Sequence, residues 1–303
     1  MRANSRALLG TVVCLLRGAN FICYIVGMSL RNLIEMALAE DLGEVGDITT
    51  QATVGAAQRG RGRVVAKQAL VLSGTAVIAE TFAALGGAEV TLHGRDGDRV
   101  EKGTLIAEIT GPLRTLLSGE RVMLNLLMHC CGVATLTRRA ADAVAGTRTR
   151  VLDTRKTTPG LRALEKAAVR DGGGHNHRFG LGDGMLIKDN HITAAGSITR
   201  AVQQARAAAH HLLKIECEVS TTTQIDEALA AGADILLLDN MDDASLAAAV
   251  SRIGGRALCE ASGNMSLERL PAVARCGVDF VSMGALTHSA PAADLSMKID
   301  AAS

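Results

Sequence analysis

Aromatic residues are scarce in this 303-residue chain: Phe, Trp and Tyr together make up 2% of it, and Trp is absent. The core must therefore be aliphatic, and the chain lacks the stacking platforms with which proteins bind single-stranded nucleic acid. An excess of one charge is also missing, because 32 Lys and Arg stand against 31 Asp and Glu, a net charge of +1. No overall field would draw the protein onto nucleic acid or a membrane, so we expect neither as a partner.

Paired cysteines are missing as well. The 7 Cys residues are odd in number and form no CxxC motif, which argues against a disulfide framework and a structural zinc site. We expect buried, reduced thiols and a cytoplasmic location. Hydrophobic residues make up 48% and charged residues 21% of the chain, a balance typical of globular proteins. The length allows one large domain or two modest ones.

The N-terminal segment lacks the uninterrupted apolar run of a signal peptide or a membrane-spanning helix. Its apolar stretch, Ala7–Gly27, is broken by Arg17 and Asn20, whereas a signal peptide needs about 7–15 and a spanning helix ~20 consecutive apolar residues. Met28 directly precedes a helical pattern, so we expect it to be the natural start and residues 1–27 to be an upstream over-translation. A disordered or weakly membrane-seeking leader is the alternative.

The first half of the chain mixes helical and β-type patterns. Leu30–Ala39 has helix spacing, Asp47–Thr50 reads as a loop, and one helix is expected near 75–85 among short β-type runs. From Leu113 to about Ala145 the pattern is helical, with a break expected near Gly132. The expected strands are Arg63–Ala66, Leu70–Leu72, Ala88–Leu92 and Leu105–Ile109.

The second half repeats strand and helix in alternation, which predicts a parallel sheet. Gly232, Gly254 and Gly277 follow three expected helices, at the C-terminal position where a positive φ is cheap only for glycine. No GxGxxG motif follows a strand, so a dinucleotide-binding fold is disfavoured. The helices are Thr222–Ala231, Asp243–Ile253 and Leu267–Cys276; the strands are Val151–Leu152, Met185–Ile187, Leu213–Ile215, Ile235–Leu238, Arg256–Cys259 and Phe280–Met283.

All six expected strands run into polar or charged residues at their C-terminal ends. In an α/β barrel these ends converge on one mouth, where active sites lie. A single polar strand end would mean little, but six together predict an active-site mouth. The groups are Asp153–Lys156, Lys188–His191, Glu216 and Glu218, Asp239 and Asn240, Glu260–Gly263, and Ser282–Gly284.

Four cations near this mouth predict a polyanionic ligand, because Arg binds carboxylate or phosphate with two N–H groups and Lys binds as a point charge. Backbone N–H groups near Ser262–Gly263 and Ser282–Gly284 could hold a phosphate. The cations are Arg155, Lys156, Arg178 and Lys188.

Glu218 and Asp239 would weaken an anion site unless a hard cation such as Mg²⁺ accompanies them. The other acidic residues, Asp153, Asp189, Glu216 and Glu260, are lesser candidates, and a surface ion pair or helix cap explains Asp189 or Glu260 equally well. His175 and His177 could suggest a metal site, but the adjacent Arg178 favours contact with an anion.

Ordered motifs from about Leu30 to Ile299 resemble quinolinate phosphoribosyltransferase, the carboxylating nicotinate-nucleotide pyrophosphorylase family. Only the first 27 residues fall outside the resemblance. The motifs are Glu40–Gly43, Gly46–Thr50, Asp153–Gly160, Glu165–Arg170, Gly172–Leu181, Leu186–His191, Leu237–Met241, Glu260–Gly263 and Gly284–Ser289.

The resemblance implies an N-terminal α/β sandwich domain over residues 28–130, completed by the C-terminal tail 288–303. It implies an incomplete, seven-stranded α/β barrel over residues 131–287, with the seventh strand near 132–137 or Gly180. The implied reaction converts quinolinate and phosphoribosyl pyrophosphate, with Mg²⁺, into nicotinate mononucleotide, pyrophosphate and CO₂. A homodimer is implied, and some relatives form hexamers.

By motif position, the resemblance assigns catalysis to Lys188, Glu218 and Asp239, with both carboxylates on the Mg²⁺ and ribose side. Lys188 would contact the phosphoribosyl donor. Arg121, in the stretch Gly119–Asn125, would reach into the partner's site. Quinolinate binding is implied for Arg155, His177 and Arg178, with Lys156 close by, and 5′-phosphate binding for Ser262, Gly263 and Gly284. The remaining implied substrate-binding positions are Thr154, Asn264, Ser282 and Met283. Asn264 departs from the family pattern, since many members have glycine there.

The implied mechanism has pyrophosphate leaving the ribose carbon as the pyridine nitrogen attacks, after which the 2-carboxylate departs as CO₂. Three alternatives stay open. A molybdenum-transport-associated branch of the same fold would act on a different acceptor. A barrel lyase would use Lys188 as a Schiff-base amine, which Glu218 and Asp239 oppose. A non-catalytic binding protein would not need the full charge set.

Overall fold

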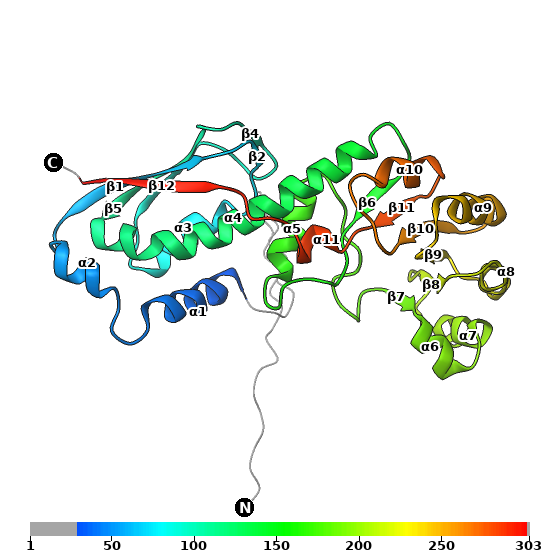
Figure 1. Cartoon of the computed structure of the whole chain (residues 1–303). Helices are drawn as coiled ribbons and strands as arrows, with labels where there is room; N and C mark the ends of the chain where they lie inside the picture. Colours follow the sequence, from blue (N-terminus) through cyan, green and yellow to red (C-terminus); the bar gives the residue numbers. More distant parts are fainter. Residues whose placement is uncertain (1–28, 302–303) are drawn as a thin grey trace, which may run out of the picture.

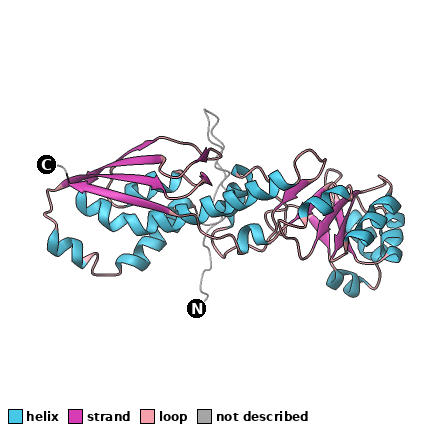
Figure 2. Cartoon of the chain, turned by 45° about the horizontal axis from the view of Figure 1, so that its top comes forward, coloured by secondary structure: helices cyan, strands magenta, loops and turns pink. Residues whose placement is uncertain are grey.

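The computed structural model describes residues 29–301, and the expected leader 1–27 lies outside them. Figure 1 shows an elongated molecule with a sheet at each end and one long helix between them, and Figure 2 shows the two sheets from a second direction. We refer to residues 29–112 with 295–301 as the antiparallel half, and to residues 150–288 as the parallel half. None of the described helices is long and apolar enough to cross a membrane.

The antiparallel half is built on a four-stranded sheet in the order β12-β1-β5-β3. Its strands are β1 (Arg59–Ala66), β3 (Glu89–Leu92), β5 (Leu105–Pro112) and β12 (Leu295–Ala301), with the short pair β2 (Leu70–Val71) and β4 (Arg99–Val100) beside it. Alternate residues of β1 are buried, as expected of a strand with one face on the core. The core beneath the sheet is apolar and includes Phe82, Ile106, Leu116 and Met123.

Three short helices complete this half: α1 (Leu30–Leu42), α2 (Ile48–Thr53) and α3 (Ala76–Ala84). The expectation of a loop at Asp47–Thr50 was wrong. Asp47 caps α2, because its side chain accepts the backbone N–H of Thr50 at 2.9 Å. The polar sequence was read as a loop, although Asp followed by Thr residues is equally typical of a helix start.

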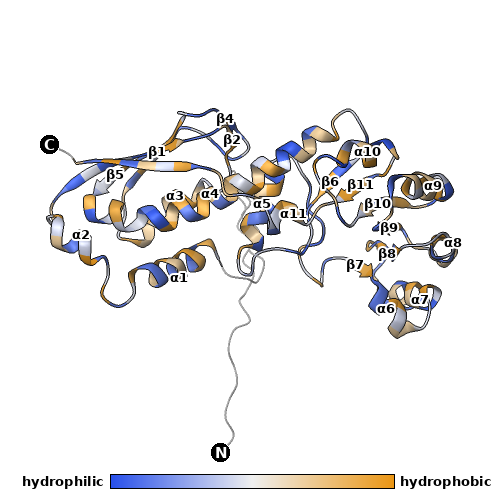
Figure 3. Cartoon of the chain, viewed as in Figure 1, coloured by the Kyte–Doolittle hydropathy of each residue, from blue (hydrophilic) through white to orange (hydrophobic). Residues whose placement is uncertain are grey.

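Helix α4 (Leu113–Ala143) joins the halves as one unbroken helix of 31 residues. The break expected near Gly132 was therefore wrong. A Cβ at Gly132 would collide with the carbonyl oxygen of Pro291, so glycine serves close packing of the returning chain and does not end the helix. In Figure 3, α4 alternates hydrophobic and hydrophilic stretches, as a helix with both packed and exposed faces should.

The parallel half contains a six-stranded sheet in the order β6-β11-β10-β9-β8-β7, with every pairing parallel. The helices α7 to α10 line its outer side in Figure 1. The strands are β6 (Arg150–Leu152), β7 (Met185–Ile187), β8 (Ile215–Val219), β9 (Ile235–Asp239), β10 (Leu258–Ser262) and β11 (Phe280–Ser282). The helices are α5 (Arg162–Asp171), α6 (Asp189–Ala195), α7 (Ile198–Ala208), α8 (Thr222–Ala231), α9 (Asp243–Ile253), α10 (Leu270–Arg275) and α11 (Ala285–His288).

The predicted parallel sheet and its glycine signals are confirmed. Gly232 and Gly254 end α8 and α9 with φ of 86° and 56°, and Gly277 follows α10 with φ of 85°. Strands β8 and β10 lie about two residues later than expected, because Glu216 and Glu260 belong to the strands and not to the loops after them. In β8, Cys217 packs into the core while the flanking glutamates alternate to the other face.

The two positions suggested for a seventh strand are not strands. Residues 132–137 belong to α4, and Gly180 lies in a bend. Within the described residues, the parallel sheet is extended only by an isolated bridge between Leu152 and His175. Glycine and polar residues around 172–184 give this segment too little apolar surface to form a longer strand.

Candidate active site

The polar strand ends meet at one edge of the parallel sheet. Ser262 lies beside Asp239 in the β9–β10 register, and Glu218 lies beside Leu237 in the neighbouring β8–β9 pair. The C-terminal ends of adjacent parallel strands must share an edge, so these groups converge although they are separated in sequence. We call the groups at this edge the mouth; they are Asp153–Lys156, Lys188, Glu218, Asp239, Ser262–Asn264 and Ser282–Gly284.

Lys188 and Glu218 face each other across the mouth. Lys188 Nζ donates to Glu218 Oε2 at 3.1 Å, and the Lys188 side chain is 50% exposed. The backbone N–H of Lys188 donates to His191 Nδ1 at 2.9 Å as α6 begins, which fixes the turn that carries the lysine. The exposed Lys188 side chain is thereby kept beside a carboxylate, at a place where it can contact an anionic ligand.

Asp239 ends β9 next to Glu218 on β8. Its Oδ2 accepts a hydrogen bond from Asn240 Nδ2 at 2.7 Å. The two carboxylates supply hard oxygen donors and only two protein ligands, which is the donor set that suits Mg²⁺, an ion that keeps water and substrate oxygens around it. The donor chemistry of these two residues therefore fits the expected ion.

The loops after β9 and β10 hold an unusual backbone. Asn240 and Asn264 have φ of 55° and 50°, and they are the two non-glycine residues with positive φ in residues 29–301. Gly263 between them has φ of 87°, and a Cβ there would collide with the Asn240 side chain. Asn264 Nδ2 donates to Asn240 Oδ1 at 3.2 Å. Strained backbone of this kind clusters at ligand sites, so these two loops are a candidate phosphate site.

A buried ion pair anchors the loop that carries Arg155 and Lys156. Asp153, fully buried, accepts Lys166 Nζ at 2.5 Å, Asn176 Nδ2 at 2.6 Å and the backbone N–H of His177 at 2.8 Å. Burial raises the pKa of Asp153 and lowers that of Lys166, because each charge is held away from water. The three hydrogen bonds compensate this cost and tie the loop after β6 to α5.

Two further contacts fix the same loop. Glu165, fully buried on α5, accepts the backbone N–H of Thr158 at 3.1 Å and pairs with His129 Nε2 at 2.8 Å. Thr287 Oγ1 on α11 donates to the carbonyl oxygen of Lys156 at 2.7 Å. The exposed side chains of the loop therefore project from a backbone that is held from both sides.

Arg178 lies in the segment between α5 and β7, close to Arg155. Burial, and then the charge of Arg155, lower the pKa of Arg178. Arg178 Nη1 donates to the carbonyl oxygen of Gly184 at 2.8 Å. Two guanidinium groups near enough to repel each other form a site that a dianion would stabilise.

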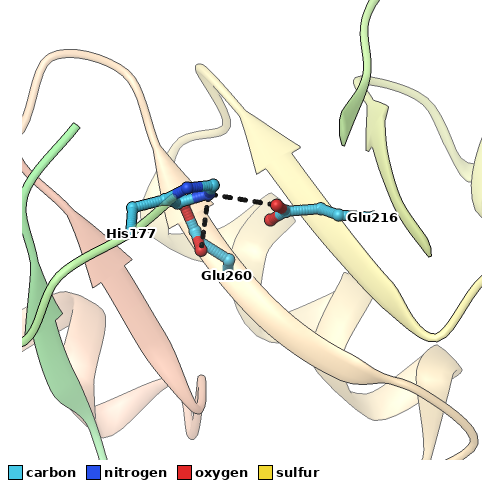
Figure 4. Close-up of side chains that lie close together, drawn as sticks. All are labelled: His177, Glu216 and Glu260. Atoms are coloured by element: carbon cyan, nitrogen blue, oxygen red, sulfur yellow. Dashed lines mark hydrogen bonds and ion pairs between the residues drawn. The ribbon is translucent and has the colours of Figure 1, made fainter. Parts of the chain in front are cut away.

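His177 turns away from this pair, toward the interior of the parallel sheet. Its Nε2 lies 3.1 Å from Glu216 Oε2 and 3.8 Å from Glu260 Oε2, as Figure 4 shows. Its Nδ1 accepts the backbone N–H of Arg178 at 2.7 Å. Both ring nitrogens are therefore engaged by the protein, and in this geometry neither is offered to the predicted quinolinate carboxylate.

A cavity of about 670 Å³ opens beneath these residues. Its lining includes Met185, Ile235 and Phe280, the first residues of β7, β9 and β11, so it lies in the parallel half and extends away from the mouth. The charged and His residues that line it are Lys166, Arg170, His175, His177, Arg178, Asp183, Lys214, Glu216 and Glu260.

Two predicted site residues do not present their side chains to the mouth of their own chain. The side chain of Met283 is buried in the core, and its N–H is engaged by the carbonyl oxygen of Leu152 at 3.0 Å. Arg121 is exposed on the part of α4 that packs under the antiparallel sheet, away from the mouth of its own chain. The positions of the other predicted residues agree with a shared site, and their contacts with substrate stay a prediction.

Sequence reasoning gave too little weight to three contributors. Asn240 was placed at the strand ends but given no role, although an Asn directly after a strand is a weak signal for the left-handed backbone it adopts. Glu216 and Glu260 were given low weight, because no sequence pattern shows that both point inward at His177. Among residues 29–301, the one group of three side chains with metal-type donors close together is this one and not Glu218 with Asp239.

The fold is that of an α/β enzyme, and its candidate anion-binding site lies at the carboxyl ends of the parallel strands. Two family models match the chain: "Quinolinate phosphoribosyl transferase, N-terminal domain" over residues 47–131 and "Quinolinate phosphoribosyl transferase, C-terminal domain" over residues 133–298. The chain belongs to the quinolinate phosphoribosyltransferase family.

Individual proteins similar to this chain support the same family assignment. The probable nicotinate-nucleotide pyrophosphorylase [carboxylating] of Bacillus subtilis is 46% identical over 273 residues, covering 90% of this chain and 94% of that protein. The Mycobacterium leprae nicotinate-nucleotide pyrophosphorylase [carboxylating] is 44% identical over 276 residues, covering 89% and 96%. The solved nicotinate-nucleotide pyrophosphorylase from Ehrlichia chaffeensis superposes with a TM-score of 0.86 at 36% identity, covering 90% of this chain and 99% of that one. The alternative of a molybdenum-transport-associated branch finds no support among these relatives.

Proposed function

We propose that this protein transfers a phosphoribosyl group from phosphoribosyl pyrophosphate to quinolinate and releases pyrophosphate and CO₂. The product is nicotinate mononucleotide, an intermediate of NAD biosynthesis. The observation that carries the proposal is the presence of two charged groups near the mouth. Arg155 and Arg178 lie close together in the first, and the second, on neighbouring strands, contains Lys188, Glu218 and Asp239. A dicarboxylate and a polyphosphate together need this division into two anion sites.

Quinolinate occupies the first group in this proposal. Arg155 and Arg178 bind its carboxylates, with Lys156 and Thr154 on the same anchored loop. Thr154 Oγ1 accepts the backbone N–H of Lys156 at 3.0 Å, which supports the turn that presents both cations. The mutual repulsion of the two arginines is relieved when the dianion binds, so the free enzyme is prepared for this ligand.

The phosphoribosyl donor occupies the second group. Lys188 contacts the pyrophosphate that departs and stabilises its developing charge, while Glu218 and Asp239 lie on the ribose side. Mg²⁺ would be held by Glu218 and Asp239 and would neutralise charge on the leaving group. The backbone of Ser262–Asn264 and the start of α11 at Gly284 cradle the 5′-phosphate.

The protein's own contribution is mainly orientation. It aligns the pyridine nitrogen with the ribose carbon, and it supplies fixed charges where charge develops. The carboxylate next to the new bond leaves as CO₂, because the positively charged pyridinium accepts its electrons. Lys188 Nζ already donates a hydrogen bond to Glu218 Oε2, which opposes its use as a Schiff-base nucleophile.

We also propose that the barrel is incomplete and that two copies of the chain form the complete site. The parallel half forms an incomplete barrel, with the Leu152–His175 bridge in the place of a seventh strand. A second copy completes the site, because Arg121 is exposed on α4 and away from its own mouth. The partner's Arg121 then adds another cation on the quinolinate side.

The direct test is an assay with purified protein, phosphoribosyl pyrophosphate and Mg²⁺. Product from quinolinate, and none from nicotinate as the control acceptor, supports the proposal, whereas no product from quinolinate contradicts it. Calorimetry then tests the site: Arg155→Ala should abolish quinolinate binding and leave the oligomer intact. Arg139→Ala, an exposed arginine on α4, is the matched control and should bind normally.

A further inference from the structure

We propose that Glu216 and Glu260 are positioning residues that hold His177 beneath the substrate site, so that His177 fixes Arg178 and does not itself bind quinolinate. The inference rests on the proposed function for the identity of the ligand. It gives a role to the interior group shown in Figure 4, which lies below the mouth and takes no part in the chemistry described above.

The tautomer of His177 follows from its contacts. Nδ1 accepts the backbone N–H of Arg178 at 2.7 Å, so Nδ1 carries a lone pair and no proton. The proton of the neutral ring must then be on Nε2, which points at Glu216 Oε2 at 3.1 Å and passes Glu260 Oε2 at 3.8 Å. Each nitrogen thus has one defined role, Nδ1 as acceptor and Nε2–H as donor.

The same tautomer argues against a metal ion. A metal bound by His177, Glu216 and Glu260 would need the lone pair of Nε2, which carries the proton while Nδ1 accepts from Arg178. The cations of Lys166 and Arg178 line the same cavity and would repel a dication. The three donors are therefore a hydrogen-bonded group.

Charge sets the state of the two glutamates. Their side chains are only 6% and 3% exposed, and no protein donor within the described residues reaches Oε1 of either one. Two buried carboxylates this close together repel each other, and a neutral ring compensates neither charge. Burial, and then the charge of Glu216, raise the pKa of Glu260 to about 8. Glu260 is therefore the carboxylic acid at neutral pH, and Glu216 Oε2 is the oxygen that His177 Nε2 approaches at 3.1 Å.

The contacts of His177 also decide whether its ring is neutral or charged. Burial lowers the pKa of His177, but the hydrogen bond to Glu216 and the charges of Glu260 and Glu216 outweigh it and raise the pKa above its usual value; a proton on Glu260 takes away the charge of that group. A second proton on the ring would have to sit on Nδ1, where it would face the N–H of Arg178. The ring therefore stays neutral while that contact is made.

The consequence concerns Arg178. Its backbone is held by His177 Nδ1, and one guanidinium N–H is held by the carbonyl oxygen of Gly184 at 2.8 Å. The remaining guanidinium donors are free to be aimed at the substrate carboxylate. Glu216 and Glu260 thus influence the binding of quinolinate through His177 and then Arg178. They should not affect the binding of the phosphoribosyl donor.

Steady-state kinetics of matched variants test this chain of contacts. His177→Asn keeps an acceptor, Oδ1, near the place of Nδ1, whereas His177→Leu removes it. We expect the KM for quinolinate to rise less than fivefold in His177→Asn and more than thirtyfold in His177→Leu, with the KM for phosphoribosyl pyrophosphate within twofold in both. Equal losses in the two variants would overturn the positioning role and favour direct binding through Nε2.

The protonated state of Glu260 has its own pair of variants. Glu260→Gln is neutral and keeps a donor, so it should stay within threefold of the parent KM and kcat, and Glu260→Leu should raise the quinolinate KM at least tenfold. If Gln fails as badly as Leu, the neutral-acid assignment is wrong. Circular dichroism confirms that each variant folds.

A spectroscopic measurement separates this proposal from the proposed function. Nitrogen NMR of the full chain should show His177 as the neutral tautomer with its proton on Nε2. An imidazolium, or a stoichiometric transition metal that is lost in His177→Leu, would overturn the inference whether or not the protein turns over quinolinate. A parent enzyme without quinolinate activity would refute the function and leave this readout intact.

Discussion

The two halves of the molecule bury different kinds of side chain. Beneath the antiparallel sheet the buried side chains are apolar or uncharged, with Phe82 and Ile106 at their centre. All of the buried charged residues in the described chain lie in the parallel half. They are Asp153, Glu165, Lys166, Glu216 and Glu260.

This difference indicates that the antiparallel half is built for stability, whereas the parallel half gives up some stability to position its functional residues. A buried charge costs several kcal/mol unless it is paired and hydrogen-bonded, so a half that only needs to be stable avoids it. In the parallel half three of these side chains contact segments that carry proposed substrate ligands: Asp153 and Glu165 hold the Arg155 loop, and Glu216 contacts His177, next to Arg178. The charges are retained because they fix the geometry of the mouth.

The largest effect is expected from removing one partner of the buried pair. Lys166→Met leaves Asp153 uncompensated in the interior, which should cost about 3–5 kcal/mol in the free energy of unfolding. Lys188→Met is the matched control, because it breaks an ion pair whose lysine is half exposed and should cost at most about 1 kcal/mol. Chemical denaturation measures both, and equal losses would mean that the Asp153 pair carries no special weight.

A backbone change in the mouth should be smaller. Gly263→Ala adds a Cβ that collides with Asn240 at φ of 87°; such strain costs about 1–3 kcal/mol. It should also raise the KM for phosphoribosyl pyrophosphate, because the N–H groups around Gly263 move. In the control Gly255→Ala, φ is 78° but nothing lies within 4 Å, so stability should fall without a change in KM. An unchanged KM in Gly263→Ala would remove this loop from the phosphate site.

Alkaline pH should weaken the parallel half through its buried thiols. Burial, and then the neighbouring Glu218, raise the pKa of Cys217 to about 12, whereas an unfolded thiol titrates near ~8.5. The raised folded pKa means that this contribution to stability is complete below about 8.5 and is lost progressively up to about 12. Cys217→Ala should therefore flatten the fall of unfolding free energy above pH 9 by about 1.4 kcal/mol per pH unit.

The half-buried Cys276 supplies the control for that titration. Cys276→Ala should change the slope less than Cys217→Ala. Burial raises the pKa of Cys276 too, but this thiol is less completely buried than Cys217. If both variants show the slope of the parent, the alkaline loss arises elsewhere.

The smallest effect is expected in the antiparallel half. Phe82→Leu nearly conserves volume in an apolar core, so it should cost about 1 kcal/mol. The KM values for both substrates should stay unchanged, since Phe82 touches no charged network. Thermal denaturation and steady-state kinetics measure the two quantities, and a shift in either KM would break the separation between the halves.

Local signals in the sequence identified most of the parallel half. The glycines after α8, α9 and α10 marked the helix ends, because only glycine adopts a positive φ there at low cost. The polar strand ends located the mouth, since parallel strands must bring them to one edge. The substrates came from the family motifs and not from periodicity.

What escaped prediction depends on contacts between distant segments. Gly132 was read as a helix break, but its meaning lies in the passage of Pro291 against α4. Glu216 and Glu260 looked like strand-end loop residues, because their burial depends on His177 arriving from the segment between α5 and β7. The side-chain orientation of His177 is set by the same long-range contacts, so no local pattern could show it.

The pairing of β1 with β12 has a consequence for synthesis on the ribosome. Every residue from Gly60 to Ala66 finds its partner in the last strand, Leu295–Ala301. That strand leaves the exit tunnel only after the whole parallel half has been made, so β1 waits with one edge open while the rest of the chain appears. The first sheet to be translated is thus the last to be completed, and premature termination near the C-terminus would leave an open strand edge exposed to aggregation.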